Sequence, residues 1–122
     1  MLLRVLVLAT IGLLLGSAAR GHHSHANYDV TAFTHLEGNV KDILWINPHI
    51  WLFIEVAGED AAPVQWAIET ATPAQLGRNG VTRDTVHVGD SVSLRCHRLV
   101  DDSNGWLLGY LTGRDGVERL WD

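Results

Sequence analysis

Three histidines stand within four residues near the N-terminus, in the run Arg20-Gly21-His22-His23-Ser24-His25. Neutral imidazole nitrogen is a common ligand for copper, nickel and zinc. The surrounding segment has no apolar periodicity, so these histidines have no core to pack into. The spacing predicts a metal-binding arm in which His22, His23 and His25 bind copper or a similar divalent transition metal. The alternative is a solvated polar arm that binds nothing.

The geometry of such a site depends on where the chain is cut. Residues 1–21 have the basic start, apolar run and small-residue end of a secretory signal peptide. Cutting after Ala19 would leave Arg-Gly-His, whose amine, backbone nitrogens and imidazole form the square-planar set that Cu(II) and Ni(II) prefer. Cutting after Gly21 would let the amine and imidazole of His22 chelate one metal together. Cutting after Ala26 would remove the cluster.

The fourth candidate ligand, His49, ends the Asn-Pro-His turn between two apolar runs. Proline fixes φ and donates no backbone N–H, which favours a turn between strands. His49 is predicted either to donate to a backbone carbonyl and lock this turn, or to complete the metal site. The nearby Trp45 and Trp51 are candidates to line a ligand face or to shelter a cation. The isolated histidines are predicted to lie on the surface or at strand edges: His35, His87 and His97.

A β-rich domain must position these residues. Alternation of apolar and polar side chains with period two predicts strands, at 36–45, 50–56, 64–70, 91–99, 106–112 and 117–121. One short helix is predicted at 74–79, because Thr72 can cap it, Pro73 suits its first position and Gly80 its end. This order is typical of the small Greek-key barrel called the OB-fold. A β-sandwich is the alternative architecture.

The chain of 122 residues is expected to hold one folded domain. A flexible arm at 22–35, able to settle near Tyr28, would follow the signal peptide and precede an OB-like barrel at 36–122. Gly38 and Gly109 fall inside strands, where a small barrel bends sharply. Cys96 is the single cysteine, and its place in the alternation predicts a small buried hydrophobe rather than a reactive thiol or metal ligand.

Charge and motifs narrow the classes of function. Without residues 1–21, seven basic residues face fourteen acidic ones, so the surface would repel nucleic acid and anionic lipid and attract cations. Neither a nucleic-acid partner nor a membrane span after cleavage is expected. The sequence holds no nucleophile elbow, P-loop, zinc-protease or dinucleotide motif, so the chain is not expected to be an enzyme.

Five stretches occur together in this chain: His22-His23-Ser24, Gly38 to Leu52, Trp66 to Glu69, Leu76 to Asp84 and Gly89 to Val92. Together they resemble a family of small exported bacterial proteins classed as a domain of unknown function (DUF6152 type). The resemblance covers essentially the whole chain after the signal peptide. Its departures are His25, where the family usually has phenylalanine, and Val81, where it has tryptophan. The resemblance implies export and a small β-fold, and it supplies no function.

Two alternative functions are therefore considered for a protein expected to be periplasmic or secreted. The first is a binding module that holds a metal ion through the N-terminal histidines and His49. The second is a structural or interaction protein of the cell envelope, whose exposed tryptophan face docks another envelope protein.

Overall fold

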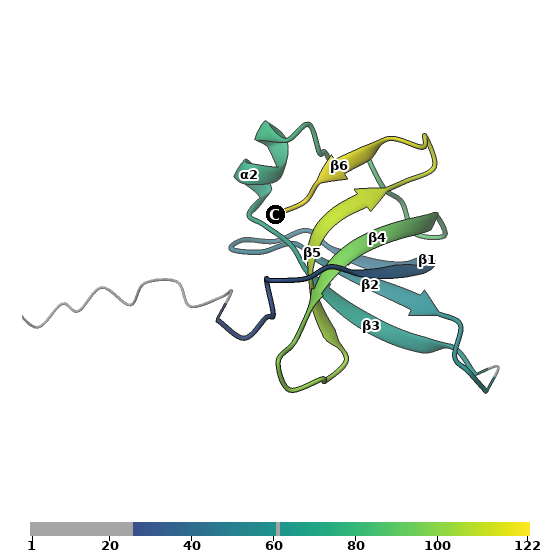
Figure 1. The fold of residues 1–122 in the computed structure, drawn as a ribbon. Coiled ribbons are helices and arrows are strands. Elements are labelled where there is room, and N and C mark those ends of the chain that lie inside the picture. The colour runs from purple at the N-terminus through teal and green to yellow at the C-terminus, as the bar shows by residue number, and fades with distance from the viewer. Residues whose placement is uncertain (1–25, 61) are drawn as a thin grey trace, which may run out of the picture.

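The computed structural model describes residues 26–60 and 62–122. Within these ranges every predicted strand and the predicted helix are present, and their ends lie within two residues of the predicted ones. Figure 1 shows the strands curling around a common centre, with the helix at one end. The elements are β1 (Thr34–Leu44), β2 (Trp51–Val56), β3 (Val64–Glu69), α2 (Pro73–Arg78), β4 (Ser91–Arg98), β5 (Gly105–Thr112) and β6 (Glu118–Leu120).

The strands close into a barrel. The sheet order is β3-β2-β1-β4-β5-β6, and an additional pairing joins β3 to β5. That pairing is parallel and runs from Ala67 opposite Gly105 to Glu69 opposite Leu107. Strands β1 to β5 therefore form a closed ring with a helix between β3 and β4, and β6 extends the sheet beyond it. The predicted OB-like barrel is confirmed, and the β-sandwich alternative is wrong.

Strand β1 is long enough to serve two neighbours. Its first part pairs with β4 and its second part with β2, and Asn39 has a partner on both sides. Gly38 lies at this changeover, where β1 comes so close to β2 that a Cβ atom would stand 2.4 Å from the Glu55 carbonyl oxygen. Gly109 is the extra residue of a bulge between β4 and β5, since Arg95 opposes Tyr110 and Cys96 opposes Leu108. Gly109 therefore stands at a bulge, and Gly38 stands where two strands approach too closely for a side chain.

The alternating apolar side chains fill the barrel. Ile50, Leu52 and Ile54 are fully buried, while their neighbours Trp51 and Phe53 are only partly buried. Trp45 and Trp66 pack partly buried against this core. Burying an aliphatic side chain of this size contributes about 1.5–3 kcal/mol to stability. The barrel is therefore stabilised mainly by burial of these alternating side chains rather than by strand propensity. The other fully buried or nearly buried members include Val40, Ile68, Leu76, Leu94, Cys96, Leu108 and Trp121.

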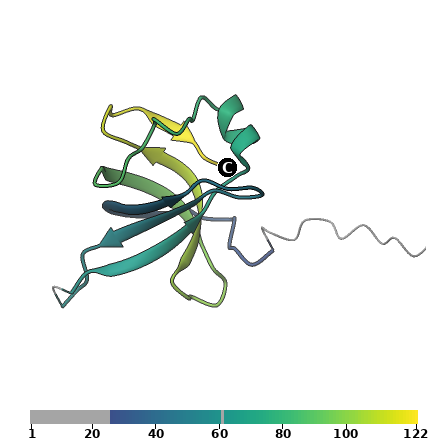
Figure 2. The same cartoon turned by 180° about the vertical axis from the view of Figure 1, so that it is seen from behind.

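Helix α2 closes one end of the barrel. The Thr72 hydroxyl caps it by accepting from the Gln75 N–H at 3.1 Å, and Gly80 ends it with a φ of +78°. The Asn79 side chain donates to the carbonyls of Leu120 and Asp122, so the helix end is tied to the strand β6. The view from behind shows α2 and β6 at the same end (Figure 2). No helix within the described ranges has the length and apolar character needed to cross a membrane.

Residues 27–33, here called the strap, cross from the start of the described chain to β1. The Val100 N–H donates to the Asn27 carbonyl at 2.9 Å, and the Asp29 N–H donates to the Arg98 carbonyl at 2.8 Å. Tyr28 is only 9% exposed. In the part of the arm that the structure describes, the chain does settle on the barrel near Tyr28. Strand β1 begins at Thr34, two residues before the predicted start of the barrel.

The buried thiol of Cys96 should make the protein less stable as the pH rises above the ordinary pKa of a thiol. Burial raises the pKa of this thiol from 9.0 to about 12, so between these values it is neutral in the folded protein and ionised in the unfolded chain. The unfolded chain then binds fewer protons, so the free energy of unfolding should lose at most about 1.4 kcal/mol per pH unit. Urea unfolding across this alkaline range checks the effect. Cys96→Ala should give a shallower slope, and equal slopes for the two proteins would contradict the assignment.

Candidate functional site

The outer face of β2 and β3 gathers His49, Trp51 and Glu69. His49 lies two residues before Trp51, so both point away from the core side occupied by Ile50. Trp51 is the cross-strand partner of Glu69 in the register of β2 and β3. Directly opposed residues of an antiparallel pair share one face of the sheet. The side chains of His49 and Glu69 are 20% and 13% exposed, so this group is half-enclosed but open to solvent.

His49 is held in one orientation by the connection between β3 and α2. Its Nδ1 lies 2.7 Å from the Thr70 carbonyl oxygen. A carbonyl can only accept, so Nδ1 carries the proton and donates it. With Nδ1 donating to the carbonyl, Nε2 is the ring nitrogen left to bind a metal. The predicted bond from His49 to a backbone carbonyl is confirmed, and the acceptor is the carbonyl of Thr70, directly after β3.

Tyr28 of the strap reaches the same group. Its hydroxyl donates to Glu69 Oε2 at 2.7 Å, while Oε1 of that carboxylate lies 3.7 Å from Nδ1 of His49. Burial, together with the hydrogen bond and the charge of Glu69, raises the pKa of the Tyr28 hydroxyl, so it stays protonated and donating. The carboxylate of Glu69 is thus shared between the strap and His49.

Glu69 and Tyr28 were not among the predicted site residues. They lie 41 positions apart in the chain, and only the barrel register brings them together. The available signal was the alternation of β3, which puts Glu69 on the outer side, combined with the expectation that the arm settles at Tyr28.

The two tryptophans near the turn have different surroundings. Trp45 packs partly buried against the core, and the guanidinium carbon of Arg83 lies 5.3 Å from the centroid of its ring. A cation from the chain itself therefore covers the Trp45 face. Trp51 is partly buried beside Glu69. Of the two, Trp51 is the one that borders the His49 group.

One of the three histidines predicted to be peripheral is not. His97 is buried at 8% exposure, its ring stacks on Phe33 with centroids 4.3 Å apart, and its Nδ1 donates to the Ala32 carbonyl at 2.8 Å. The prediction of a surface or strand-edge position was wrong for His97, because the strap covers this part of β4. His35 and His87 are exposed, as predicted.

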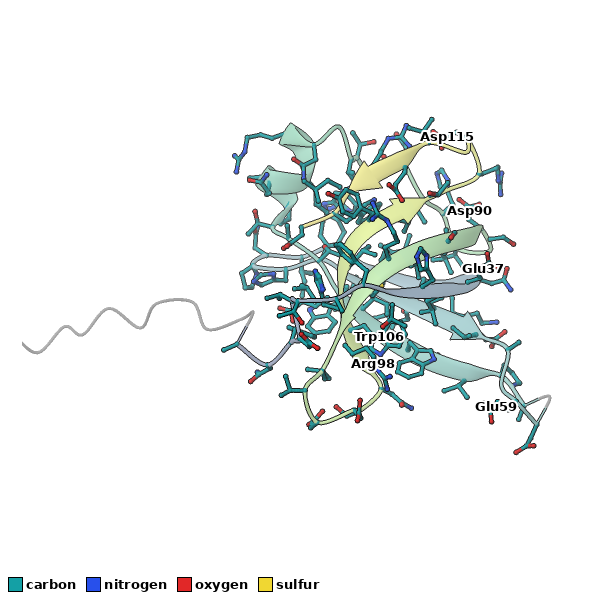
Figure 3. The ribbon with its side chains drawn as sticks, viewed as in Figure 1. Glu37, Glu59, Asp90, Arg98, Trp106 and Asp115 are labelled. Atoms are coloured by element: carbon teal, nitrogen blue, oxygen red, sulfur yellow. The ribbon has the colours of Figure 1, made fainter. Side chains whose placement is uncertain are left out.

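Two open grooves lie elsewhere on the barrel, and neither is lined by His49, Trp45 or Trp51. One holds Asp90, a buried carboxylate that accepts from the exposed Arg114 and from the His87 N–H. The other runs past Glu37 and Gly38. In Figure 3 the labelled carboxylates Glu37, Glu59 and Asp90 lie on the right-hand side of the view. Arg98 and Trp106, also labelled there, form a cation–π pair, with the guanidinium carbon 6.0 Å from the centroid of the ring.

The remaining predicted ligands, His22, His23 and His25, lie outside the described residues. Among residues 26–60 and 62–122, no group of three or more histidine, cysteine or acidic side chains is arranged to hold a metal ion. Of the four predicted ligands, the structure therefore places only His49.

Comparison with known proteins gives a family. The model of a family of unknown function (DUF6152) matches residues 12–107, which is most of the chain, and the protein belongs to that family. No curated protein and no solved structure matches the chain.

Proposed function

We propose that this member of the DUF6152 family is an exported binding module that holds a divalent transition-metal ion, copper or a similar one. The ligands would be His22, His23 and His25 together with Nε2 of His49. The observation that carries the proposal is the continuous contact from the strap to Glu69 and from Glu69 to His49. It anchors the chain that follows the histidine cluster beside the fourth predicted ligand.

The state of His49 suits a ligand. Histidines that bind metals usually donate their second ring N–H to a carbonyl or carboxylate, which fixes the tautomer and the direction of the ring. His49 donates Nδ1–H to the Thr70 carbonyl and has the Glu69 carboxylate close to the same nitrogen. Its Nε2 is therefore oriented before any metal arrives, which lowers the entropy cost of binding.

The histidine cluster directly precedes the strap in the chain. His25 precedes Tyr28 by three residues, and three residues span at most about 10 Å. The Tyr28 hydroxyl already contacts Glu69, the neighbour of His49. An acidic chain with seven basic and fourteen acidic residues after position 21 adds a favourable field for a cation.

Calorimetric titration of the exported, naturally processed protein with Cu(II), Ni(II) and Zn(II) tests the proposal. The intact mass is measured first, because it shows whether processing leaves the histidine cluster in place. We expect submicromolar binding of at least one of these ions, and a loss of at least about tenfold in His49→Ala, equivalent to about 1.4 kcal/mol.

The matched control is His35→Ala, which removes an exposed imidazole from β1 and should bind the metal as the wild type does. Binding weaker than micromolar in the wild type, or an unchanged affinity in His49→Ala, would overturn the proposal. A mature chain that starts after residue 25 would overturn it as well.

A second function has a separate observation in its favour. Leu44 and Ile46 are both 44% exposed at the tip of the hairpin between β1 and β2, next to Trp45. This exposed apolar tip favours an accessory protein of the cell envelope that docks a partner. Trp45 and Trp51 alone would not favour it, because both are partly buried. Association with an envelope protein that survives chelation, and that is lost on replacing Leu44 and Ile46 by serine, would favour this function over metal binding.

A further inference from the structure

Three side chains that carry an amide or a carboxyl group directly precede a glycine: Asn79, Asn104 and Asp115. In such a pair the backbone nitrogen of the glycine can attack the side-chain carbonyl carbon of the residue before it. Glycine favours this reaction because it has no Cβ atom to hinder the approach and few restrictions on its backbone. The fold gives the three pairs very different surroundings.

Asn79 is held in place at the end of α2. Its Nδ2 donates to the carbonyls of Leu120 and Asp122 at 3.2 and 3.3 Å, and its Oδ1 accepts from Nε2 of Gln75 at 3.2 Å. The N–H of Gly80 is also bonded, within the last turn of the helix. The side chain of Asn79 therefore cannot turn toward the Gly80 nitrogen unless the end of the helix opens.

Asp115 is held as well, and its charge protects it further. Its Oδ2 accepts from Nη2 of Arg119 at 2.8 Å, and its Oδ1 accepts from the Val117 N–H at 3.0 Å. These bonds hold the pKa of the Asp115 carboxyl below its usual range, so the group is ionised at neutral pH. An ionised carboxylate repels a nucleophile, so this pair is also protected.

Asn104 has neither kind of protection. It is exposed in the loop between β4 and β5, which stands out from the barrel at the bottom of the view in Figure 1. No group within residues 26–60 and 62–122 is hydrogen-bonded to its side-chain amide. The Gly105 N–H donates to the Ser103 carbonyl at 2.8 Å, a bond that closes only a three-residue turn. The side chain can therefore turn toward Gly105 without breaking a bond of its own.

We propose that Asn104 is a site of spontaneous deamidation in the folded protein, independent of metal binding. The Gly105 nitrogen forms a bond to Cγ of Asn104, and the side-chain amide leaves as ammonia, which carries away the proton that the nitrogen loses through solvent. A succinimide ring results. Water then opens the ring at either of its two carbonyls and gives aspartate or isoaspartate, so the net reaction consumes one water and releases one ammonia.

The two products differ in their effect on the barrel. Aspartate leaves the backbone unchanged, whereas isoaspartate leads the main chain through the former side chain and adds one carbon directly before Gly105. At this point the Ala67 N–H donates to the Asn104 carbonyl at 3.5 Å, and Ala67 opposite Gly105 begins the parallel pairing of β3 with β5. Isoaspartate should therefore loosen the pairing that closes the ring.

Peptide mapping by mass spectrometry tests the proposal on the purified protein, incubated at neutral and mildly alkaline pH. Deamidation is detected as the mass gained when NH₂ is replaced by OH. We expect Asn104 to react at least about tenfold faster than Asn79, because Asn79 reacts only from states in which the helix end is open. The matched control is the same chain in guanidinium chloride, where both Asn-Gly pairs are unprotected and should react at similar rates.

Two variants separate the reaction from its consequence. Asn104→Gln lengthens the side chain, so the ring would need six members, and modification at this position should stop. Asn104→Asp has the charge of the product without the added carbon. Amide hydrogen exchange of Ala67 should be faster in the isolated isoaspartate form than in the wild type, and unchanged in freshly prepared Asn104→Asp.

Faster loss of the amide at Asn104 than at Asn79 in the folded protein, with equal rates in the unfolded chain, supports the proposal. Equal rates in the folded protein would overturn it. Reaction at neither position in the folded protein, while both react in the unfolded chain, would overturn it as well. If the isoaspartate form exchanges the Ala67 amide as slowly as the wild type, the expected effect on ring closure is wrong and the modification site stands.

Discussion

Replacing Trp121 by alanine should destabilise the protein by about 3–5 kcal/mol, the usual cost of removing a large aromatic side chain from a core. Trp121 is 1% exposed and belongs to the central cluster. Its backbone bonds to Gly109 of β5 and to Ala71 before α2, so the indole sits where the helix closes the barrel. The indole N–H has no acceptor among the described residues, so the expected loss comes from packing rather than from a hydrogen bond.

Urea unfolding of the wild type and Trp121→Ala measures this loss. Leu120→Ala is the matched control, because Leu120 is the last residue of β6, directly before Trp121, and is 38% exposed. Its replacement should lower the free energy of unfolding by no more than about 1 kcal/mol, because an exposed side chain makes few packing contacts. A similar loss in both variants would contradict the assignment of Trp121 to the core.

Replacing Gly38 by alanine should cost about 3 kcal/mol, the upper part of the range for overpacking. The new Cβ atom would stand 2.4 Å from the Glu55 carbonyl oxygen and 2.7 Å from a methyl carbon of Ile54. The first of these is a backbone atom within β2, so it cannot move aside as a flexible side chain would. The strands β1 and β2 would have to separate at the point where β1 changes partners.

Gly77→Ala is the control for this variant. Gly77 lies within α2, and a Cβ atom there would meet nothing within 4 Å. Alanine in a helix is favoured over glycine by about 0.5–1 kcal/mol, so this replacement should stabilise the protein. Denaturant unfolding of both variants should therefore give shifts of opposite sign. A neutral or stabilising Gly38→Ala would show that β1 and β2 are further apart than described.

Much of the barrel could be predicted because its signals are local. Alternation placed Leu52, Ile54 and Cys96 inside, and a capping threonine followed by proline marked the helix. Gly109 was expected at a bend and is the residue of a bulge. Such signals depend on neighbours two to four positions away, which the sequence contains directly.

The site could be predicted only in part because it depends on contacts between distant segments. His49 was identified from its turn, but Thr70, Glu69 and Tyr28 reach it through the pairing of β2 with β3 and through the strap. The error on His97 has the same origin. An isolated histidine on a strand gives no sign that Ala32 and Phe33, more than sixty positions earlier, will cover it.

The parallel pairing of β3 with β5 has a consequence for the order of folding. It joins only three residue pairs, whereas β1 and β4 share six, so it returns less stability for the loop that it closes. The loop-closure entropy of such a contact must be overcome before the contact contributes stability. We therefore expect the β1-β2-β3 meander and the β4-β5 hairpin to form first, and the ring to close last. In the native protein the same short pairing is where the ring should open most readily.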